Sequence, residues 1–258
     1  MWRHIAQSLQ GRSHAADGSP CQDTARVRVV GEGEAQTLIA CVADGAGTAA
    51  HASEGSRIAC ESIVEHASEY FEARGSWDGL AIEDVIGWCE EARRRIREEA
   101  LSRACSTREF ATTLCAALLA PQKSFFFQIG DGAIILRSGG IYGVVFWPQS
   151  GEYANSTNFL TADDFRVHLE FGAAAVDFSD VALFTDGLER LALQFETRTP
   201  HPPFFSPLFD ALRSAADQER LSEDLRRFLQ SDSVRARSDD DTTLILASRL
   251  SGPIGEAA

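Results

Sequence analysis

The order of apolar and polar positions predicts a β-hairpin followed by two helices in the first part of the chain. Residues 24–31 and 36–43 are rich in β-forming side chains and are separated by a turn-forming Gly-Glu-Gly-Glu segment. A helical pattern follows over residues 50–74, where apolar side chains fall roughly on one face. A second helix is predicted over 82–106, and its mixed charges at i,i+4 spacing are typical of a solvated face.

Short strands joined by tight turns are predicted for much of the remaining chain. Four of them follow in quick succession, over residues 111–120, 124–129, 133–138 and 141–147. Their separators are turn formers, which indicates antiparallel pairing. The pattern then predicts a polar loop or flap over 148–160, a buried strand at 181–184, helices over 204–217 and 219–230, and a last strand over 243–248.

These elements come in blocks, in the order ββ, αα, ββββ, β, αα, β, rather than in strict alternation. Such an order argues against a parallel α/β fold. It favours the α+β class, as a four-layer α-β-β-α sandwich in which two antiparallel sheets pack together and helix pairs cover their outer faces. Because no repeat, low-complexity segment or linker divides the chain, residues 1–258 are expected to form a single domain.

Charge adds a constraint on function. The chain of 258 residues carries 38 acidic and 24 basic side chains, for a net charge of −14. This balance argues against nucleic acid or an anionic membrane surface as the main partner. A strongly acidic protein that handles phosphate needs local positive charge, and metal ions can supply it.

The cysteines and the N-terminus favour a cytoplasmic location. None of the six cysteines forms a CxxC pair, and several lie in apolar runs, so we expect small buried residues in a reducing compartment rather than disulfides. The N-terminus lacks the long apolar stretch of a signal peptide. No window approaches 18 apolar residues, so no membrane span is expected.

Aspartates recur in one context, at the end of an apolar strand or in the tight turn beside it. The five places are Asp23, Asp44, Asp131, Asp186 and the run from Asp239 to Asp241. Any one of them can be read as an ordinary Asp-Gly or loop turn. If the strands share a sandwich, however, their ends can converge, and clustered carboxylates repel one another unless cations neutralise them. Carboxylates and carbonyls are ligands that Mg²⁺ and Mn²⁺ prefer, which indicates metal-assisted hydrolysis or phosphoryl transfer.

The strings around these aspartates resemble a known family. CQD, VADGAG, QIGDGA, FTDGLERL and DDDTTLILA look like the ordered motif set of the type-2C metal-dependent protein Ser/Thr phosphatases, in particular their compact bacterial branch. The resemblance runs from about Gly11 to Ala247. Each string is weak alone, but the ordered set is specific. The family's β-sandwich flanked by helix pairs agrees with the element order.

The resemblance implies a role for each position. Asp44 would bridge two central metals, the carbonyl of Gly45 would bind one of them, and Asp186 and Asp240 would ligate the other. Asp23 would act through metal-bound water, and Asp131 would form a third site together with Asp186. The cofactors implied are two or three Mn²⁺ or Mg²⁺ ions, and a hydroxide that bridges two metals would attack phosphorus in line. Asp241 stands where the family often has Asn and keeps an oxygen acceptor.

Two positions depart from the family pattern. Ala46 replaces a His that serves many relatives as a candidate general acid, and Gly18 replaces an Arg that binds phosphate. His14 lies just upstream of the metal loop and is therefore a candidate for proton donation and for substrate binding. The alternative is a structural hydrogen bond from His14.

Two further segments have weaker predictions. Residues 151–158 resemble the same branch and are predicted either to be a flap that touches protein substrate or to be a loop held by its own Asn and Thr side chains. The segment from Ser53 to Ser56 is expected to orient the first helix over the site, without a chemical role.

The leading hypothesis is hydrolysis of phosphoserine and phosphothreonine in phosphorylated protein substrates, in a signalling role that involves a cognate Ser/Thr kinase. The missing His and Arg leave two alternatives open. One is a catalytically weak regulatory or binding protein on the same fold, and the other is a small-molecule phosphatase.

Overall fold

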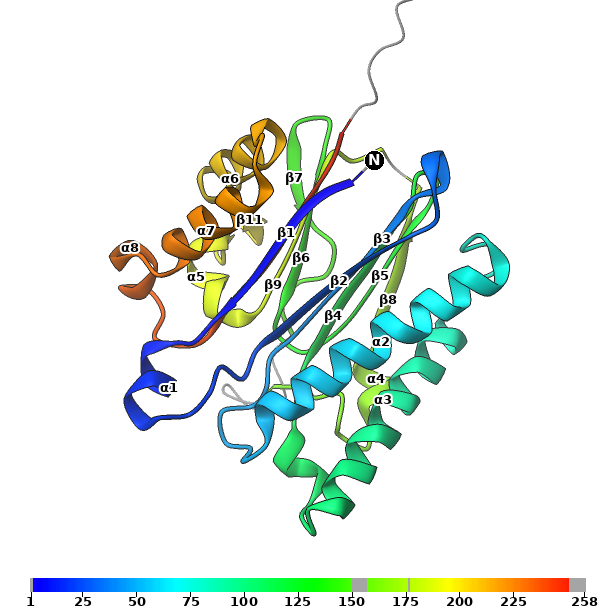
Figure 1. Ribbon diagram of the computed structural model, residues 1–258, viewed down its shortest axis with the longest axis vertical. Helices are drawn as coiled ribbons and strands as arrows, with labels where there is room; N and C mark the ends of the chain where they lie inside the picture. Colours follow the sequence, from blue (N-terminus) through cyan, green and yellow to red (C-terminus); the bar gives the residue numbers. More distant parts are fainter. Residues whose placement is uncertain (1, 150–156, 176, 251–258) are drawn as a thin grey trace, which may run out of the picture.

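The computed structural model describes residues 2–149, 157–175 and 177–250. Two five-stranded antiparallel sheets form the centre of the fold, and Figure 1 shows them as two neighbouring layers of strands. The β1 sheet consists, in spatial order, of β1 (Trp2–Leu9), β12 (Thr242–Arg249), β9 (Asp180–Phe184), β6 (Ala133–Ser138) and β7 (Ile141–Val144). The β2 sheet consists of β2 (Thr24–Val30), β3 (Thr37–Ala43), β4 (Leu114–Leu119), β5 (Ser124–Ile129) and β8 (Glu170–Ala174).

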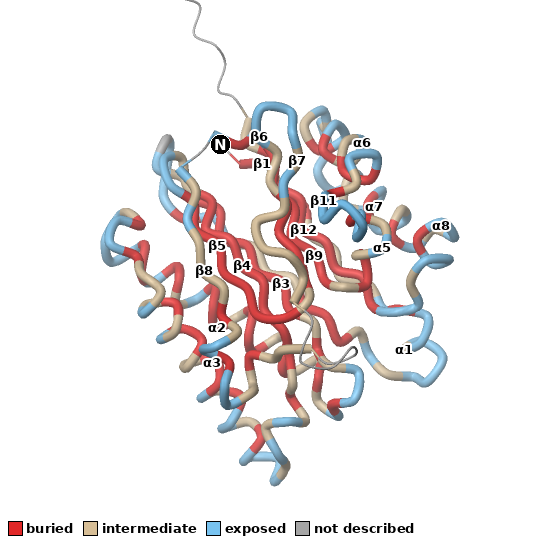
Figure 2. Tube along the Cα trace, turned by 180° about the vertical axis from the view of Figure 1, so that it is seen from behind, coloured by how far each residue is buried: buried red, intermediate tan, exposed pale blue. Residues whose placement is uncertain are grey.

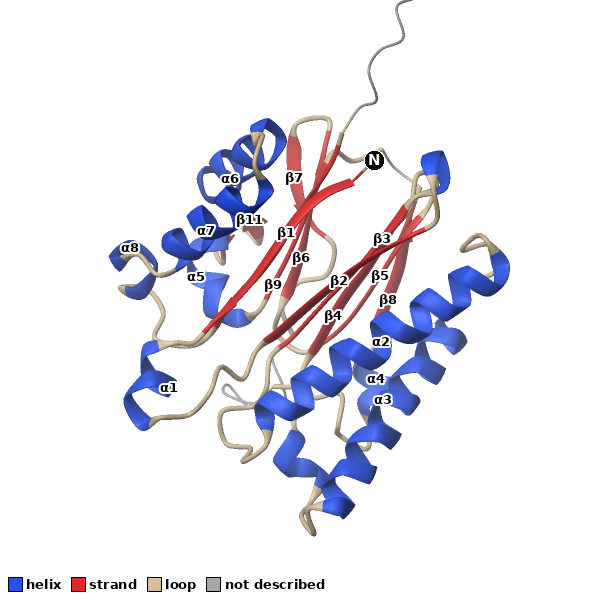
Figure 3. Cartoon of the chain, in the orientation of Figure 1, coloured by secondary structure: helices blue, strands red, loops and turns tan. Residues whose placement is uncertain are grey.

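One pair of long helices covers the outer face of each sheet (Figure 3). The antiparallel pair α2 (Ala52–Arg74) and α3 (Ile82–Ser102) packs on the β2 sheet, and α6 (Pro202–Ser214) and α7 (Gln218–Leu229) pack on the β1 sheet. The predicted α+β class and its four-layer α-β-β-α sandwich are therefore confirmed.

Shorter elements connect these layers. They are α1 (Arg12–Asp17), α4 (Phe165–His168), α5 (Glu189–Ala192), α8 (Asp232–Arg235), the small hairpin of β10 (Leu193–Gln194) and β11 (Thr199–Pro200), and single turns of 3-10 helix at Gly33–Ala35, Thr107–Phe110 and Asp186–Leu188. Across the described ranges, none of the helices combines the length and apolar character needed to span a bilayer. All six cysteines are free, and four of them are buried.

The side-chain alternation along each central strand explains the layering. In β3, Leu38 and Val42 point into the core between the two sheets, whereas Ile39 and Cys41 point into the core under α2 and α3. Strands β4, β9 and β12 divide their side chains in the same way. Each buried Val, Leu, Ile or Phe stabilises the fold by about 1.5–3 kcal/mol. Figure 2 shows the result, with buried strands in the middle and exposed residues on the outer helices.

The apolar pattern predicted the central strands and the long helices but not β1 or β8, which lie at sheet edges. Strand β1 pairs with β12 along its full length, from Trp2 opposite Arg249 to Leu9 opposite Thr242. Several predicted boundaries also extend three or four residues too far. The second helix ends at Ser102 rather than at residue 106, and the strand predicted from residue 111 begins at Leu114. The strand predicted over 141–147 ends at Val144, and the helix predicted over 204–217 ends at Ser214.

Candidate metal centre

Strand register brings the aspartates to one end of the sandwich. The start of β2 at Thr24 pairs with the end of β3 at Ala43. Asp23, just before β2, and Asp44, just after β3, therefore lie at the same edge of the sheet. In the β1 sheet, Phe184 at the end of β9 pairs with both Ala133 and Leu244 near the starts of β6 and β12. The flanking residues, including Asp131, Asp186 and Asp241, therefore lie at the corresponding edge of the β1 sheet.

Three of these carboxylates form the centre of the site. Asp44, Asp131 and Asp186 each offer an oxygen, and these oxygens lie within 4.8 Å of one another. The hydroxyl of Thr157 donates to Oδ2 of Asp131 at 2.8 Å. Oδ1 of Asp131 is buried and has no hydrogen-bond partner among the residues that the structure describes. A buried acceptor without a partner is costly, so this oxygen is suited to a cation ligand.

The pKa values of these carboxyl groups are raised because the groups are buried close to one another. Burial, followed by the charges of Asp23 and Asp186, raises the pKa of Asp44 well above its ordinary value. Burial raises the pKa of Asp186 to about 7, with further contributions from Asp131 and Asp240. The three central carboxylates are partly open to solvent but have protein on most sides. A divalent cation among them would remove the repulsion that raises these pKa values.

The backbone around Asp44 is held by two threonines. Its N–H donates to the hydroxyl of Thr113 at 2.9 Å, and its carbonyl accepts from the hydroxyl of Thr112 at 2.9 Å and the N–H of Thr113 at 2.8 Å. The next residue, Gly45, donates to the carbonyl of Gln22. A Cβ atom at Gly45 would lie 2.5 Å from the carbonyl oxygen of Ala52, so no other residue fits this position without a shift.

Asp23 is almost fully buried and connects the two sheets. Its Oδ2 accepts a hydrogen bond of 2.6 Å from the hydroxyl of Thr185, which precedes Asp186. The Thr185 hydroxyl also accepts from the N–H of Thr243 at 3.2 Å. Burial is the largest cause that raises the pKa of Asp23 to about 8, although the Thr185 hydrogen bond lowers it.

Asp240 lies in a second group, together with His14 and Asp241. Its side chain is exposed, and its charge contributes to the raised pKa values of both Asp131 and Asp186, so it lies within electrostatic reach of the centre. The structure thus brings every predicted aspartate to one rim, with Asp240 at its solvent side.

Asp241 is buried and stabilises the rim itself. Its two oxygens accept from the N–H of Gly11 at 2.6 Å and the N–H of Gln22 at 2.5 Å. Nδ1 of His14 lies 3.0 Å from Oδ1 of Asp241, within ion-pair distance although not aligned as a hydrogen bond. Because these partners already occupy the Asp241 oxygens, the group of His14, Asp240 and Asp241 is better explained as a polar connection than as a separate cation site.

His14 lies between Asp241 and the turn that follows Asp44. Burial lowers its pKa, but Asp241, Asp240 and Asp17 outweigh that effect, so the pKa is raised overall. Nε2 of His14 points toward the turn at Gly47, directly after Asp44 and Gly45. One ring nitrogen of His14 faces Asp241 and the other faces the turn after Asp44. The position is therefore compatible both with a structural contact and with proton donation or substrate binding.

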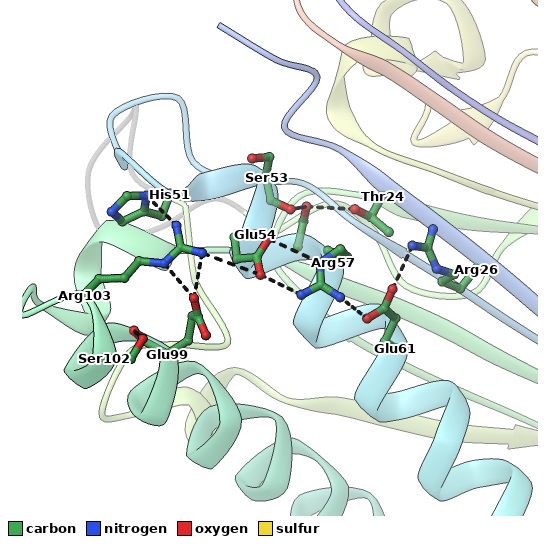
Figure 4. A network of polar contacts seen from close by, with 11 residues as sticks. Thr24, Arg26, His51, Ser53, Glu54, Arg57, Glu61, Glu99, Ser102 and Arg103 are labelled. Atoms are coloured by element: carbon green, nitrogen blue, oxygen red, sulfur yellow. Dashed lines mark hydrogen bonds and ion pairs between the residues drawn. The ribbon is translucent and has the colours of Figure 1, made fainter.

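The start of α2 is tied to the same rim. The Ser56 hydroxyl donates to the carbonyl of Gln22 at 2.6 Å and lies 3.0 Å from the hydroxyl of Thr24, on either side of Asp23. This contact matches the expected orienting role of the segment from Ser53 to Ser56. Figure 4 shows the ion pairs around it, in which Arg57 joins Glu54 to Glu61 and Arg103 bridges from α3 to Glu54.

The predicted flap lies mostly outside the described residues, which resume at Thr157. Asn158 donates to Oε1 of Gln149 at 3.2 Å, and the same oxygen accepts from the N–H of Gly130, next to Asp131. The described end of the segment thus uses its Thr and Asn side chains to hold the Asp131 turn.

The departure at Gly18 has a conformational reason. Gly18 ends α1 in the left-handed region, with φ of +80°, where an arginine would be strained. The sequence analysis did not single out the threonines that support the carboxylates: Thr112, Thr113 and Thr185. Their only sequence signal is their position within two residues of a strand end.

Comparison with known proteins identifies the family. A family model described as Protein phosphatase 2C matches residues 10–230. The chain is also similar to Serine/threonine-protein phosphatase 3 of Escherichia coli strain K12, with 36% identity over 252 residues that cover 95% of this chain and 98% of the relative.

Solved structures support the fold at lower identity. Serine/threonine phosphatase Stp1 from Staphylococcus aureus superposes with a TM-score of 0.65 at 15% identity, covering 97% of this chain and 96% of that one. The catalytic domain of the serine/threonine protein phosphatase PstP, in complex with two manganese ions, has a TM-score of 0.61 at 17% identity, covering 96% and 97%.

Proposed function

Because the chain belongs to the protein phosphatase 2C family, we propose that it hydrolyses phosphoserine and phosphothreonine in proteins with the help of bound divalent cations. The observation that carries this proposal is the cluster of Asp44, Asp131 and Asp186 at the common end of the two sheets. In this proposal residues 1–258 act as one catalytic domain.

The residues present fit a site for two or three Mn²⁺ or Mg²⁺ ions. Asp44, Asp186, Asp240, Asp131 and the carbonyl of Gly45 would hold them. The partnerless oxygen of Asp131 and the mutual repulsion of the carboxylates support this assignment. Bound cations would supply Lewis-acid activation of water and would neutralise charge on the phosphoryl oxygens.

Asp23 would act on water rather than bind a cation directly. Its carboxylate is buried against Thr185, whose hydroxyl fixes one oxygen by donating to it. The other oxygen is then left to orient a water molecule toward phosphorus. Since Thr185 and Asp186 are consecutive, the same turn positions both the ligand and the water-orienting group.

His14 would provide the proton and the substrate contact that Ala46 and Gly18 do not provide. When water attacks phosphorus, the ester P–O bond breaks and the departing serine or threonine oxygen needs a proton. The acidic groups Asp241, Asp240 and Asp17 raise the pKa of His14, which favours its protonated form, and its Nε2 lies beside the Gly47 turn. The same ring can donate to a phosphoryl oxygen before the bond breaks.

A phosphoprotein substrate implies an enzyme that phosphorylates it, so we also propose a cognate Ser/Thr kinase and a signalling role. The similarity to relatives named as serine/threonine phosphatases supports this substrate class. The reducing, cytoplasmic environment that the free cysteines favour is consistent with such a partnership.

Hydrolysis of p-nitrophenyl phosphate and of phosphoserine peptides, with added Mn²⁺ or with chelator, tests the function. We expect turnover only with the cation, and a loss of roughly 100-fold or more in Asp44→Asn and Asp186→Asn, because each removes a ligand to the charge that stabilises the transition state. Asp239→Asn, an exposed neighbour of the site, is the matched control and should keep its activity.

Two outcomes would replace the proposal. Absence of cation-dependent turnover in the wild type, on every substrate, would favour a binding protein on the same fold. Efficient hydrolysis of soluble phosphate esters, with phosphopeptides left intact, would favour a small-molecule phosphatase.

A further inference from the structure

A second, basic cavity lies beside the carboxylate rim. It has a volume of about 660 Å³ and is lined by α1, the end of β1, the C-terminal part of α7, and α8. We call it the arginine pocket, because its charged lining consists of Arg12, Arg226 and Arg235. Figures 1 and 2 both show α1 and α8 as neighbours on one side of the molecule.

The charge of this pocket is opposite to that of the whole chain. The net charge is −14, yet among the described residues that line the pocket none is acidic. Arg226 lies 3.9 Å from Glu223, in an exposed pair of the kind that contributes little. Arg12 donates to the backbone carbonyl of Arg235, a contact that holds the Arg12 side chain without neutralising it. The positive charges of the three lining arginines favour an anion in this cavity.

The pocket continues toward the metal centre. A much smaller adjoining cavity shares the lining residues Gly11, Arg12 and Arg235, and is also lined by Asp240. Asp240 is one of the proposed cation ligands, and Gly11 donates to Asp241. The arginine pocket therefore lies next to the chain at Gly11 and Asp240, which borders the carboxylate rim.

We propose that the arginine pocket binds a second phosphoryl group of the substrate, so that the enzyme prefers proteins phosphorylated at two nearby positions. This inference rests on the proposed phosphatase function and adds a preference to it. Guanidinium groups bind phosphoryl oxygens through paired, charge-assisted hydrogen bonds, and three of them match a doubly charged group. A peptide phosphorylated twice can place one phosphate at the metal centre and the other in the pocket.

A phosphoprotein fits this pocket better than a nucleic acid does. The remaining surface carries the large acidic excess, which repels a long polyanion. A peptide brings only two concentrated charges and exposes little backbone charge between them.

The test compares peptides that carry one phosphoserine with peptides that carry a second one, two to five residues away on either side. For the wild type we expect at least one doubly phosphorylated peptide to have a KM about 10-fold lower than its singly phosphorylated parent, because the second phosphoryl group adds charge-assisted contacts. Arg226→Gln and Arg235→Gln should each remove most of that difference. Neither should change turnover of p-nitrophenyl phosphate.

Arg227→Gln is the matched control, because Arg227 follows Arg226 on α7 but pairs with Asp224 and does not line the pocket. It should leave the preference intact. Thermal melts of all three variants check that the fold is retained. High salt should reduce the preference of the wild type, because the contact is electrostatic.

The proposal is overturned if no doubly phosphorylated peptide is preferred, or if the arginine variants raise KM equally for both kinds of peptide. In the case of no preference, inhibition by inorganic phosphate identifies what the pocket binds. Weaker inhibition of p-nitrophenyl phosphate hydrolysis in Arg226→Gln than in the wild type would show that the pocket binds free phosphate instead. Failure of the phosphatase function itself is distinct, because it abolishes turnover on every substrate.

Discussion

Three consecutive aspartates show how much a single residue depends on its neighbours. Asp239 is exposed, and its backbone carbonyl accepts from Ser13. Asp240 is exposed at the rim of the carboxylate cluster, and Asp241 is buried and accepts two backbone N–H groups. The same side chain therefore supports the N-terminal segment at one position and is available to a cation at the next.

Asp241→Asn is expected to lower the pKa of His14 and to destabilise the fold. The carboxylate that raises the His14 pKa would become neutral, and the amide nitrogen of Asn would face one of the two N–H donors, at Gly11 or Gln22. The loss is about 1–3 kcal/mol of unfolding free energy. NMR titration of the His14 ring and thermal melts measure the two effects.

Asp239→Asn serves as the control and should change neither quantity by much. A His14 pKa that stays the same or rises in Asp241→Asn would show that this pair does not govern the ring. Both variants remove one negative charge from the same segment, so a general effect of net charge would appear equally in both.

At the scale of elements, α3 anchors the loop that returns to the site. Arg93 is almost buried, lies over the ring of Phe165, and donates to the carbonyls of Leu160 and Ala162. The N–H of Leu160 in turn donates to Thr112, which holds Asp44. A helix on the outside of the sandwich thus supports the backbone next to the carboxylates.

Arg93→Met should lower the unfolding free energy by about 1.5–3 kcal/mol, because two buried carbonyls lose a charged donor. Arg94→Met is the matched control one residue away. Arg94 is exposed and pairs with Glu91 and Glu98, so its replacement should cost less than about 1 kcal/mol. Denaturant melts of both variants give the comparison, and equal losses would contradict the anchoring role.

The pattern missed β1 and β8, two half-buried edge strands along which apolar residues do not recur with a clear period. The other two edge strands, β2 and β7, were recognised because turn formers stand beside them. The central strands β3, β4 and β9 are buried on both faces, and their continuous apolar runs were recognised.

At the scale of the whole molecule, the carboxylate cluster links stability to pH and to cations. Burial and mutual repulsion raise the pKa of Asp186 to about 7 and of Asp23 to about 8 in the folded chain, against an ordinary value of 3.8. At pH values between the ordinary pKa of 3.8 and these raised pKa values, the folded chain binds more protons than the unfolded chain does. The chelated protein should therefore lose stability as pH rises from about 4 to 8.

Thermal melts with chelator and with Mn²⁺, at pH 5.5 and pH 8, check this expectation. The melting temperature of the chelated protein should be lower at pH 8, and the increase on adding Mn²⁺ should be larger there, because protons compete with the cation for the carboxylates. A chelated protein that becomes more stable toward pH 8 would show that other groups dominate. In Asp44→Asn the cation-dependent increase should be much smaller.

The sequence alone predicted the layered fold and the aspartates that stand at its strand ends. Alternating apolar residues set which strand faces are buried, and the local turn residues beside each strand set where the aspartates stand. Both are short-range properties, which a linear pattern records. The cluster of aspartates is therefore predicted from the position of each aspartate relative to the end of its neighbouring strand.

Only the tertiary structure decided which groups meet. The pairing of Asp241 with Gly11 and Gln22, the support of Asp23 by Thr185 and the gathering of Arg12, Arg226 and Arg235 all join residues that lie far apart in the chain. No local pattern predicts such contacts, because they depend on how two sheets and their covering helices pack. That packing also determines which of two neighbouring arginines or aspartates is buried, paired or available to bind.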